Sequence, residues 1–150
     1  MIFIALMTGT IVLCWFLNST LLEKYYTSNK QHVLLTAYHN INEATSKGNT
    51  NSDTFKINVQ KLCGIYNISI LIVNADSDIV TSSVHETTAL THELMGHIFG
   101  VTDQDDDRQD EILQQTDSYT IQNSQDYRTG INYIEMWGVL DNGNPFIIRS

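Results

Sequence analysis

Apolar and polar residues divide the first third of the chain into two parts. Met1 to Leu22 carries no charged side chain, and an apolar run from Ile2 to Leu17 leads into a polar stretch without proline. In that stretch, up to Thr45, apolar residues recur every three to four positions, as on one face of a helix. These residues are Leu22, Tyr25, Tyr26, Val33, Ala37, Ile41 and Ala44. We therefore expect one continuous helix, with a membrane anchor over residues 1–20 and an amphipathic part that Gly48 terminates.

The remainder, residues 21–150, is expected to form one α+β domain with a central antiparallel sheet. A second helix should begin with Asp53 as its N-cap and carry Phe55 on its apolar face. Residues 67–74 are rich in β-branched residues and almost uniformly apolar, which predicts a central strand covered on both faces. A short helix is predicted at Thr87–Phe99. Further strands are predicted at residues 79–83, 111–116, 118–123, 130–140 and 145–149.

The last two strands are joined by an Asp-Asn-Gly sequence, a strong hairpin signal. A three-residue loop with Gly143 in the left-handed conformation would set Glu135 opposite Arg149. Opposite side chains in an antiparallel pair share a face, so this acid and base could neutralise each other. A two-residue turn at Asn142-Gly143 would instead set Met136 opposite Arg149 and move the base to the other face.

One face of the strand at residues 130–140 presents a charge among aromatic side chains. Burying Glu135 there is costly unless it is paired, and Arg149 or Arg128 could supply the partner. Alternatively, Tyr133, Glu135 and Trp137 line a small-molecule pocket, since such pockets are apolar with a few placed polar groups. Arg128, in the loop before this strand, could bind a ligand carboxylate or form a surface ion pair. The candidate ligand-binding residues are therefore Tyr133, Glu135, Trp137 and Arg128.

The charge distribution excludes a nucleic-acid partner. The formal net charge is −9, and the eight Lys and Arg residues are scattered along the chain. Between Asp76 and Asp126, twelve acidic residues stand against Arg108 alone. That half of the chain should repel anionic ligands and surfaces.

Two segments are similar to metal-binding motifs but fail in their geometry. His92 and His97 are five residues apart rather than four, so they lie about 140° apart around a helix and cannot share one zinc ion. The acidic segment 103–107 begins like an EF-hand loop, but Arg108 and Gln114 stand where the loop needs glycine and a bidentate glutamate. The sequence therefore predicts no metal and no cofactor, and solvated histidines on this helix.

Three stretches resemble the extracellular sensors of bacterial sensor histidine kinases of the Cache or PAS-like type. They are Leu22 to Tyr26, Ile68 to Asp76 and Tyr133 to Gly143, of which the last is the most specific. The resemblance implies a PAS-like/Cache domain outside the cell membrane, transmitting a signal through the long helix. Such receptors continue into a second membrane helix, a HAMP linker and a kinase core, so no catalytic residue is expected within residues 1–150. The expected partners are the membrane, a possible small-molecule ligand and a second copy bound through the N-terminal helix.

Two other classes share parts of this pattern. A chemoreceptor ectodomain has the same architecture and differs only in its cytoplasmic part. A pilin also combines an apolar N-terminal helix, an amphipathic continuation and a sheet, but pilins have an acidic residue at the fifth position. Ala5 stands there in this chain, which makes a structural filament subunit the weaker alternative.

Overall fold

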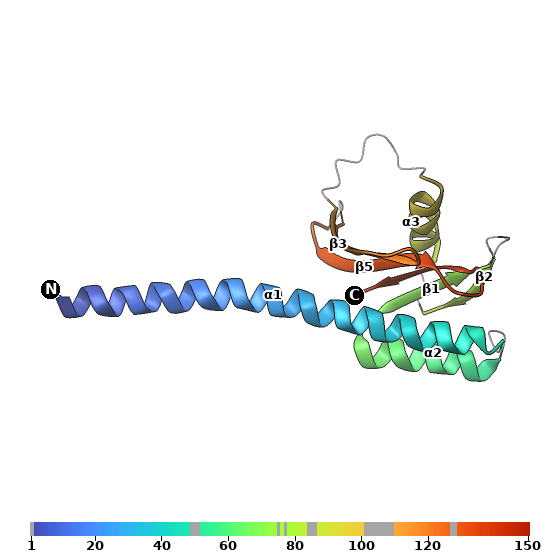
Figure 1. Cartoon of the computed structure of the whole chain (residues 1–150), viewed down its shortest axis with the longest axis horizontal. Coiled ribbons are helices and arrows are strands. Elements are labelled where there is room, and N and C mark those ends of the chain that lie inside the picture. The colour runs from blue at the N-terminus through green and yellow to red at the C-terminus, as the bar shows by residue number, and fades with distance from the viewer. Residues whose placement is uncertain are drawn as a thin grey trace.

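A long helix precedes a shorter helix and a six-stranded antiparallel sheet, and a third helix covers the sheet from the other side (Figure 1). The computed structural model describes residues 2–48, 52–74, 76, 78–83, 87–100, 110–126 and 129–150. The elements are α1 (Ile2–Ser46), α2 (Asp53–Tyr66), β1 (Ser69–Val73), β2 (Ile79–Ser82), α3 (Thr87–Phe99), β3 (Glu111–Gln115), β4 (Tyr119–Gln125), β5 (Asn132–Val139) and β6 (Pro145–Arg149). The strand order β2-β1-β6-β5-β4-β3 joins only antiparallel neighbours, which confirms the α+β class.

Helix α1 is continuous from Ile2 to Ser46, as predicted, because no proline or glycine interrupts its second half. Gly48 follows in the left-handed conformation, with φ +76°, and its N–H donates to the Thr45 carbonyl oxygen. Leu34 and Ile41 are buried against the rest of the domain. Tyr38, also on α1, lies with its ring centroid 5.0 Å from that of Tyr119 and 5.3 Å from that of Phe146, which fastens the helix to β4 and β6.

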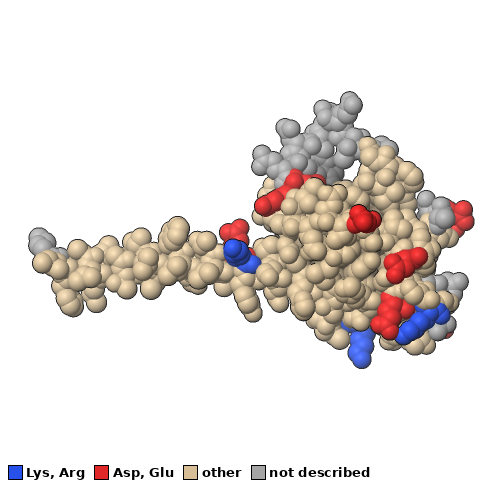
Figure 2. Space-filling view, viewed as in Figure 1, with Lys and Arg blue, Asp and Glu red and all other residues tan. Residues whose placement is uncertain are grey.

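The expected apolar face of α1 packs on its own domain over only part of its length. The side chains of Leu22, Tyr25 and Tyr26 are 63%, 74% and 61% exposed, because this part of α1 lies beyond the edge of the domain. The apolar stretch before them protrudes with no part of it buried, and it is long and apolar enough to span a membrane. Its outer part shows neither acidic nor basic side chains (Figure 2).

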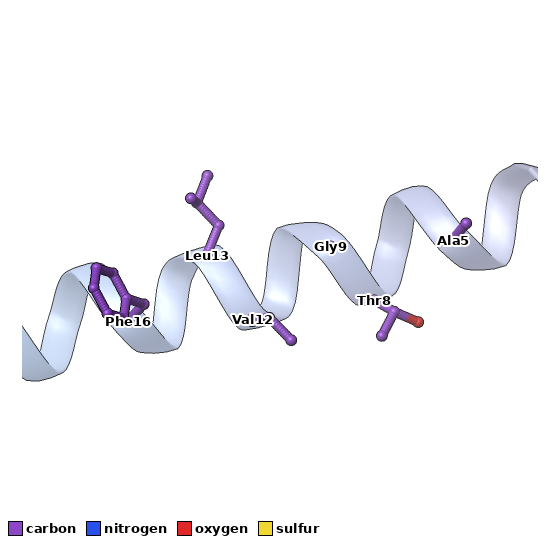
Figure 3. A pocket seen from close by; sticks show the side chains of 6 residues that line it. All are labelled: Ala5, Thr8, Gly9, Val12, Leu13 and Phe16. Carbon is purple, nitrogen blue, oxygen red and sulfur yellow. The ribbon is translucent and has the colours of Figure 1, made fainter.

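A hollow on this protruding part surrounds Gly9, which has no side chain (Figure 3). Its lining residues, Ala5, Thr8, Gly9, Val12, Leu13 and Phe16, all belong to the one helix. A hollow on one helix face cannot enclose a ligand, so it is no candidate for a small-molecule site.

Helix α2 lies against α1, and its N-cap lies one residue earlier in the chain than expected. Ser52, not Asp53, is the N-cap, because the Ser52 side chain accepts a hydrogen bond from the N–H of Phe55. Asp53 instead occupies the first turn, where an acid complements the helix dipole. The helix ends at Asn67, which is left-handed at φ 51°.

Strand β1 divides the core between the two faces of the sheet, as predicted for a strand covered on both sides. Ile70 and Ile72 pack in the cluster formed with α1 and α2, whereas Leu71 and Val73 pack with Leu90 and Leu94 of α3. All six side chains are at most 5% exposed. The predicted bounds of α3 and β6 are confirmed, and those of the other strands differ by one or two residues at either end, the usual uncertainty of strand ends.

The tight crossing of Gly138 over the chain at Ser118 provides a test of the sheet. A Cβ at Gly138 would lie 2.1 Å from the Ser118 carbonyl oxygen and 2.8 Å from the Tyr119 Cα. We expect Gly138→Ala to lower the free energy of unfolding by about 3 kcal/mol, because backbone must move to admit the methyl group. Gly64→Ala is the control: it meets nothing within 4 Å in α2 and should raise stability by about 0.5–1 kcal/mol. Denaturant unfolding measures both, and equal stability of Gly138→Ala and the parent would contradict this crossing.

Candidate functional site

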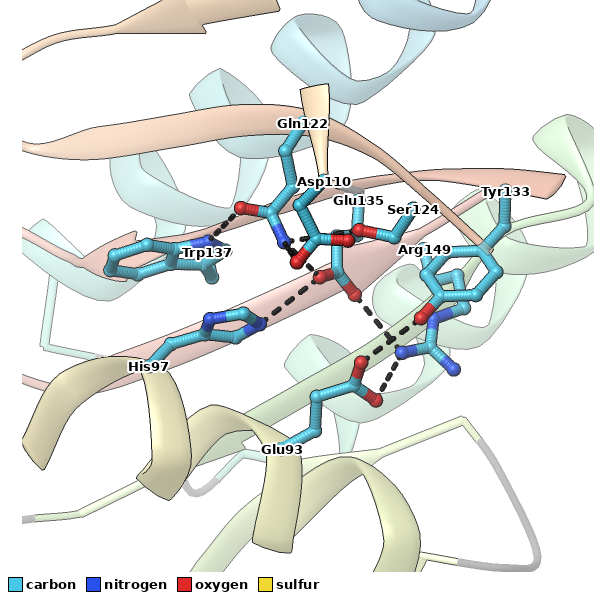
Figure 4. A network of polar contacts seen from close by, with 9 residues as sticks. All are labelled: Glu93, His97, Asp110, Gln122, Ser124, Tyr133, Glu135, Trp137 and Arg149. Carbon is cyan, nitrogen blue, oxygen red and sulfur yellow. Dashed lines mark hydrogen bonds and ion pairs between the residues drawn. The ribbon is translucent and has the colours of Figure 1, made fainter. Parts of the chain in front are cut away.

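The candidate site is a cluster of charged and aromatic side chains between α3 and the sheet, on the face opposite α1. Its centre is set by the β5–β6 hairpin, whose register is the three-residue one: Gly143 has φ +86° and Glu135 pairs with Arg149. The two-residue alternative, with Met136 opposite Arg149, is wrong. Glu135 and Arg149 therefore point together toward α3 (Figure 4).

Arg149 bridges the sheet and the helix. One terminal guanidinium nitrogen, Nη2, donates to Glu135 Oε2 at 3.0 Å and also to Glu93 Oε2 on α3. The guanidinium carbon lies 4.0 Å from the centre of the Tyr133 ring, a cation–π contact. Tyr133 in turn donates from its hydroxyl to Glu93 Oε1 at 3.0 Å. The two carboxylates raise the pKa of Arg149 even though burial alone would lower it.

Glu135 is wholly buried, at 0% exposure, and is held by three side chains. Besides Arg149, its Oε1 accepts a hydrogen bond from Gln122 Nε2 at 2.7 Å and lies 3.1 Å from His97 Nε2. Burial by itself raises the pKa of Glu135, but the hydrogen bond with His97 and the Arg149 charge outweigh it and lower that pKa below its ordinary value. The carboxylate is therefore ionised at neutral pH. Burial and the nearby Glu135 charge together raise the pKa of Tyr133, so its hydroxyl keeps its proton.

His97 is not the solvated histidine that the sequence predicted. Its side chain is only 12% exposed, and its ring stacks on Trp137 at a centroid distance of 4.8 Å and an angle of 4°. The Trp137 indole donates to Gln122 Oε1 at 3.2 Å, so Gln122 links the tryptophan to Glu135. The expectation failed because α3 turns His97 toward β5, which helix periodicity alone does not reveal.

Asp110, just before β3, adds a third carboxylate to the rim of the cluster. Its Oδ2 accepts from Gln122 Nε2 at 3.3 Å, and the same Nε2 lies 3.1 Å from the hydroxyl oxygen of Ser124. Within the described ranges, the buried atoms Asp110 Oδ1 and Arg149 Nε have no hydrogen-bond partner. The cluster thus contains one buried hydrogen-bond acceptor and one buried donor that its own side chains do not satisfy.

Three of the four predicted ligand-binding residues lie together. Tyr133, Glu135 and Trp137 share the β5 face and all take part in the cluster, whereas Arg128 lies outside the described residues. Glu93 and His97 were not among the predicted site residues, although their spacing of four residues on a predicted helix places both on one face. Nor was Gln122, for which a polar residue in an apolar strand was the available signal.

The cluster could hold a cation, because Glu93, His97 and Glu135 each offer a ligand atom and these atoms lie within 4.8 Å of one another. The prediction of no metal rested on two contiguous motifs, neither of which contains Glu135. The acidic segment 103–107 lies outside the described residues. In the structure these acids are paired with Arg149 and with His97, which stacks on Trp137, so the cluster already holds one cationic side chain.

Comparison with protein-family models, curated proteins and solved structures gives no match. The features that bear on function are therefore this cluster and its connection to α1.

The depressed pKa of Glu135 predicts how stability depends on pH. Because the folded-state pKa lies below the ordinary value of 4.5, this carboxylate stabilises the fold fully above about pH 4.5, and the contribution is lost as pH falls through the folded-state pKa. We expect Glu135→Gln to cost about 3 kcal/mol at pH 7, where Arg149 loses a buried partner. The difference in unfolding free energy between parent and variant should shrink toward acid pH.

The control for this experiment is Glu43→Gln. Glu43 forms an ion pair with Lys47 on the surface of α1, with both side chains 69% exposed, so its replacement should leave stability close to that of the parent. A difference between the parent and Glu135→Gln that is the same at pH 3 and pH 7 would contradict the ionised, buried Glu135.

Proposed function

We propose that residues 21–150 are the extracellular signal-sensing domain of a membrane receptor of the two-component sensor histidine kinase type. The proposal is supported by the apolar, protruding part of α1, by the buried charged cluster on the opposite face of the sheet, and by the β5–β6 hairpin that connects them. The third observation carries the most weight, because a sensor needs a physical link between its binding site and its anchor.

The hairpin is bonded to α1 at both of its ends. At the turn, Asn42 Nδ2 donates to Asp141 Oδ2 at 2.8 Å, and Asn42 Oδ1 accepts from the Asp141 N–H at 2.9 Å. At the other end, Lys30 Nζ donates to the Ser150 carbonyl oxygen at 3.2 Å. Ser150 directly follows Arg149, whose side chain belongs to the cluster. A displacement of Arg149 would therefore act on α1 through a neighbouring residue.

In this proposal the signal is a small ligand that shifts the cluster between two arrangements. A ligand changes such an equilibrium only by binding one arrangement more tightly than the other. The two arrangements would differ in whether Arg149 contacts Glu93 and Glu135. Tyr133, Glu135 and Trp137 would contact the ligand. A second copy would pack along the exposed apolar residues of α1, among them Leu22 and Tyr25.

The complete reading frame that encodes this chain provides a direct test. Ser150 lies beside Lys30, which follows Leu22 by eight residues, so a following segment would start about 12 Å from the uncharged part of α1. We expect a second apolar span, and beyond it a kinase core with a phospho-accepting histidine. A chemoreceptor output module in that place would assign the domain to the other receptor class. A complete reading frame with neither a second membrane span nor an output module would contradict both.

Thiol labelling tests the location of the domain. Lys56 is exposed on α2, so Lys56→Cys in a background that carries Cys14→Ser and Cys63→Ser gives a single reporter thiol on the domain surface. In intact bacterial cells that express the chain, we expect a membrane-impermeant maleimide to label this cysteine fully. Lysed cells provide the control for total reactivity, and labelling that requires lysis would contradict an extracellular domain.

A further inference from the structure

Beneath α3, three potential metal ligands converge from two elements. Glu93 and His97 are four residues apart on α3 and project from the same face, and Glu135 meets them from β5 (Figure 4). We propose that Glu93, His97 and Glu135 bind a divalent first-row transition-metal ion, with Zn²⁺ as the representative, in competition with the guanidinium of Arg149. The three ligands are spread over residues 93–135, so no contiguous sequence motif indicates the site.

The charge of the cluster favours a cation. Glu93, Glu135 and Asp110 bring three carboxylates together, and among the described side chains Arg149 is the one permanent positive charge that contacts them. Uncompensated negative charge is costly away from water, and Asp110 keeps a buried oxygen without a described partner. A divalent ion in place of the Arg149 guanidinium would bring two positive charges to these three carboxylates instead of one.

The geometry is close to that of a metal site. His97 Nε2 and Glu135 Oε1 are 3.1 Å apart, near the ligand–ligand separation of about 3.3 Å in a tetrahedral zinc site with bonds of ~2.0 Å. All three ligand atoms lie within 4.8 Å, so rotation of the Glu93 side chain has to close the widest gap by about 1.5 Å. As a zinc ligand, His97 would bind through Nε2 and carry its ring proton on Nδ1.

Arg149 occupies the position from which an ion would contact both acids. Its Nη2 donates to Glu93 and to Glu135, and metal binding would replace those two contacts. The arginine is incompletely satisfied where it lies, since its buried Nε has no partner among the described residues. An incompletely bonded buried guanidinium is easier to displace than a fully bonded one.

Neighbouring side chains already orient the proposed ligands. Gln122 donates to the Glu135 carboxylate at 2.7 Å, and the Tyr133 hydroxyl donates to Glu93 at 3.0 Å. Such outer contacts fix ligand carboxylates in metal sites. One imidazole with two carboxylates suits Zn²⁺, Mn²⁺ or Fe²⁺, whereas Mg²⁺ and Ca²⁺ prefer oxygen ligands only.

The metal site stands on these contacts alone, and its use as a signal rests on the proposed function. Release of Arg149 from Glu93 and Glu135 would remove the side-chain contacts between α3 and the end of β6, next to Ser150, which is bonded to Lys30 of α1. The signalling ligand would then be a metal ion. In one arrangement of the cluster Glu93 and Glu135 would bind Arg149, and in the other they would bind the metal.

The experiment uses the full chain in detergent micelles. Trp15→Phe leaves Trp137, stacked on His97, as the one tryptophan of the chain. Equilibrium dialysis against ZnCl₂ should give one ion per chain, and Co²⁺, which is paramagnetic, should quench Trp137 emission with the same stoichiometry. Glu93→Gln, His97→Gln and Glu135→Gln should each weaken zinc binding by at least about 100-fold. Arg149→Gln should tighten it by about tenfold, since it removes the competing cation.

His92→Gln is the matched control, because His92 lies on the same helix but outside the cluster, and it should bind zinc like the parent. No stoichiometric zinc in the folded parent and in Arg149→Gln would overturn the site. Zinc that survives Glu135→Gln but is lost in His92→Gln would also overturn it, as would stoichiometric Co²⁺ that leaves Trp137 emission unchanged. Zinc binding without any effect on receptor output would contradict the role as signal and leave the metal site intact.

Discussion

The burial of Glu135 is the constraint on which the rest of this domain depends. An ionised carboxylate with no exposure to water is stable only if the surrounding groups replace its hydration. Arg149, Gln122 and His97 do so, and each comes from a different element: β6, β4 and α3. The strand register and the position of α3 are thereby tied to one side chain. Buried ion pairs often contribute little net stability, so we interpret the pair of Glu135 and Arg149 as a determinant of conformational specificity, which selects one strand register and one position of α3.

The two faces of the sheet have different physical roles. The face toward α1 and α2 holds the larger apolar cluster, in which Tyr38, Phe146 and Ile148 are buried. The face toward α3 holds a smaller apolar cluster and, beside it, the charged group around Arg149. Apolar packing responds weakly to ions and pH, whereas the charged contacts respond strongly. The fold therefore packs α1 on one face of the sheet through apolar contacts and holds α3 on the other face partly through charged contacts that depend on ions and pH.

Helix α1 connects these properties to the protruding apolar segment. Because it is unbroken from Ile2 to Ser46, a movement of its domain-packed half is carried along the axis without a hinge. The hairpin is bonded to this half through Asn42 and, at its other end, through Lys30. The same β6 strand carries Arg149 to the cluster. One strand, β6, thus connects the charged cluster to the helix that carries the protruding apolar segment.

Much of this arrangement followed from local sequence signals. The long helix, α3, the doubly covered β1 and the pairing of Glu135 with Arg149 were all predicted, because helix spacing, strand composition and an Asp-Asn-Gly turn act over a few residues. The cap at Ser52 was misplaced by one residue, since Ser and Asp are equally good caps and only the bond to Phe55 distinguishes them.

What the tertiary structure decided is the set of neighbours around Glu135. Glu93 lies 56 residues from Arg149, and His97 lies 38 residues from Glu135, so their contacts exist only once α3 docks on the sheet. The same docking turned His97 from an expected surface residue into a buried one. The protrusion of Leu22 and Tyr25 likewise depended on where the sheet ends along α1. Local periodicity specifies which residues share a face, and long-range packing specifies what that face meets.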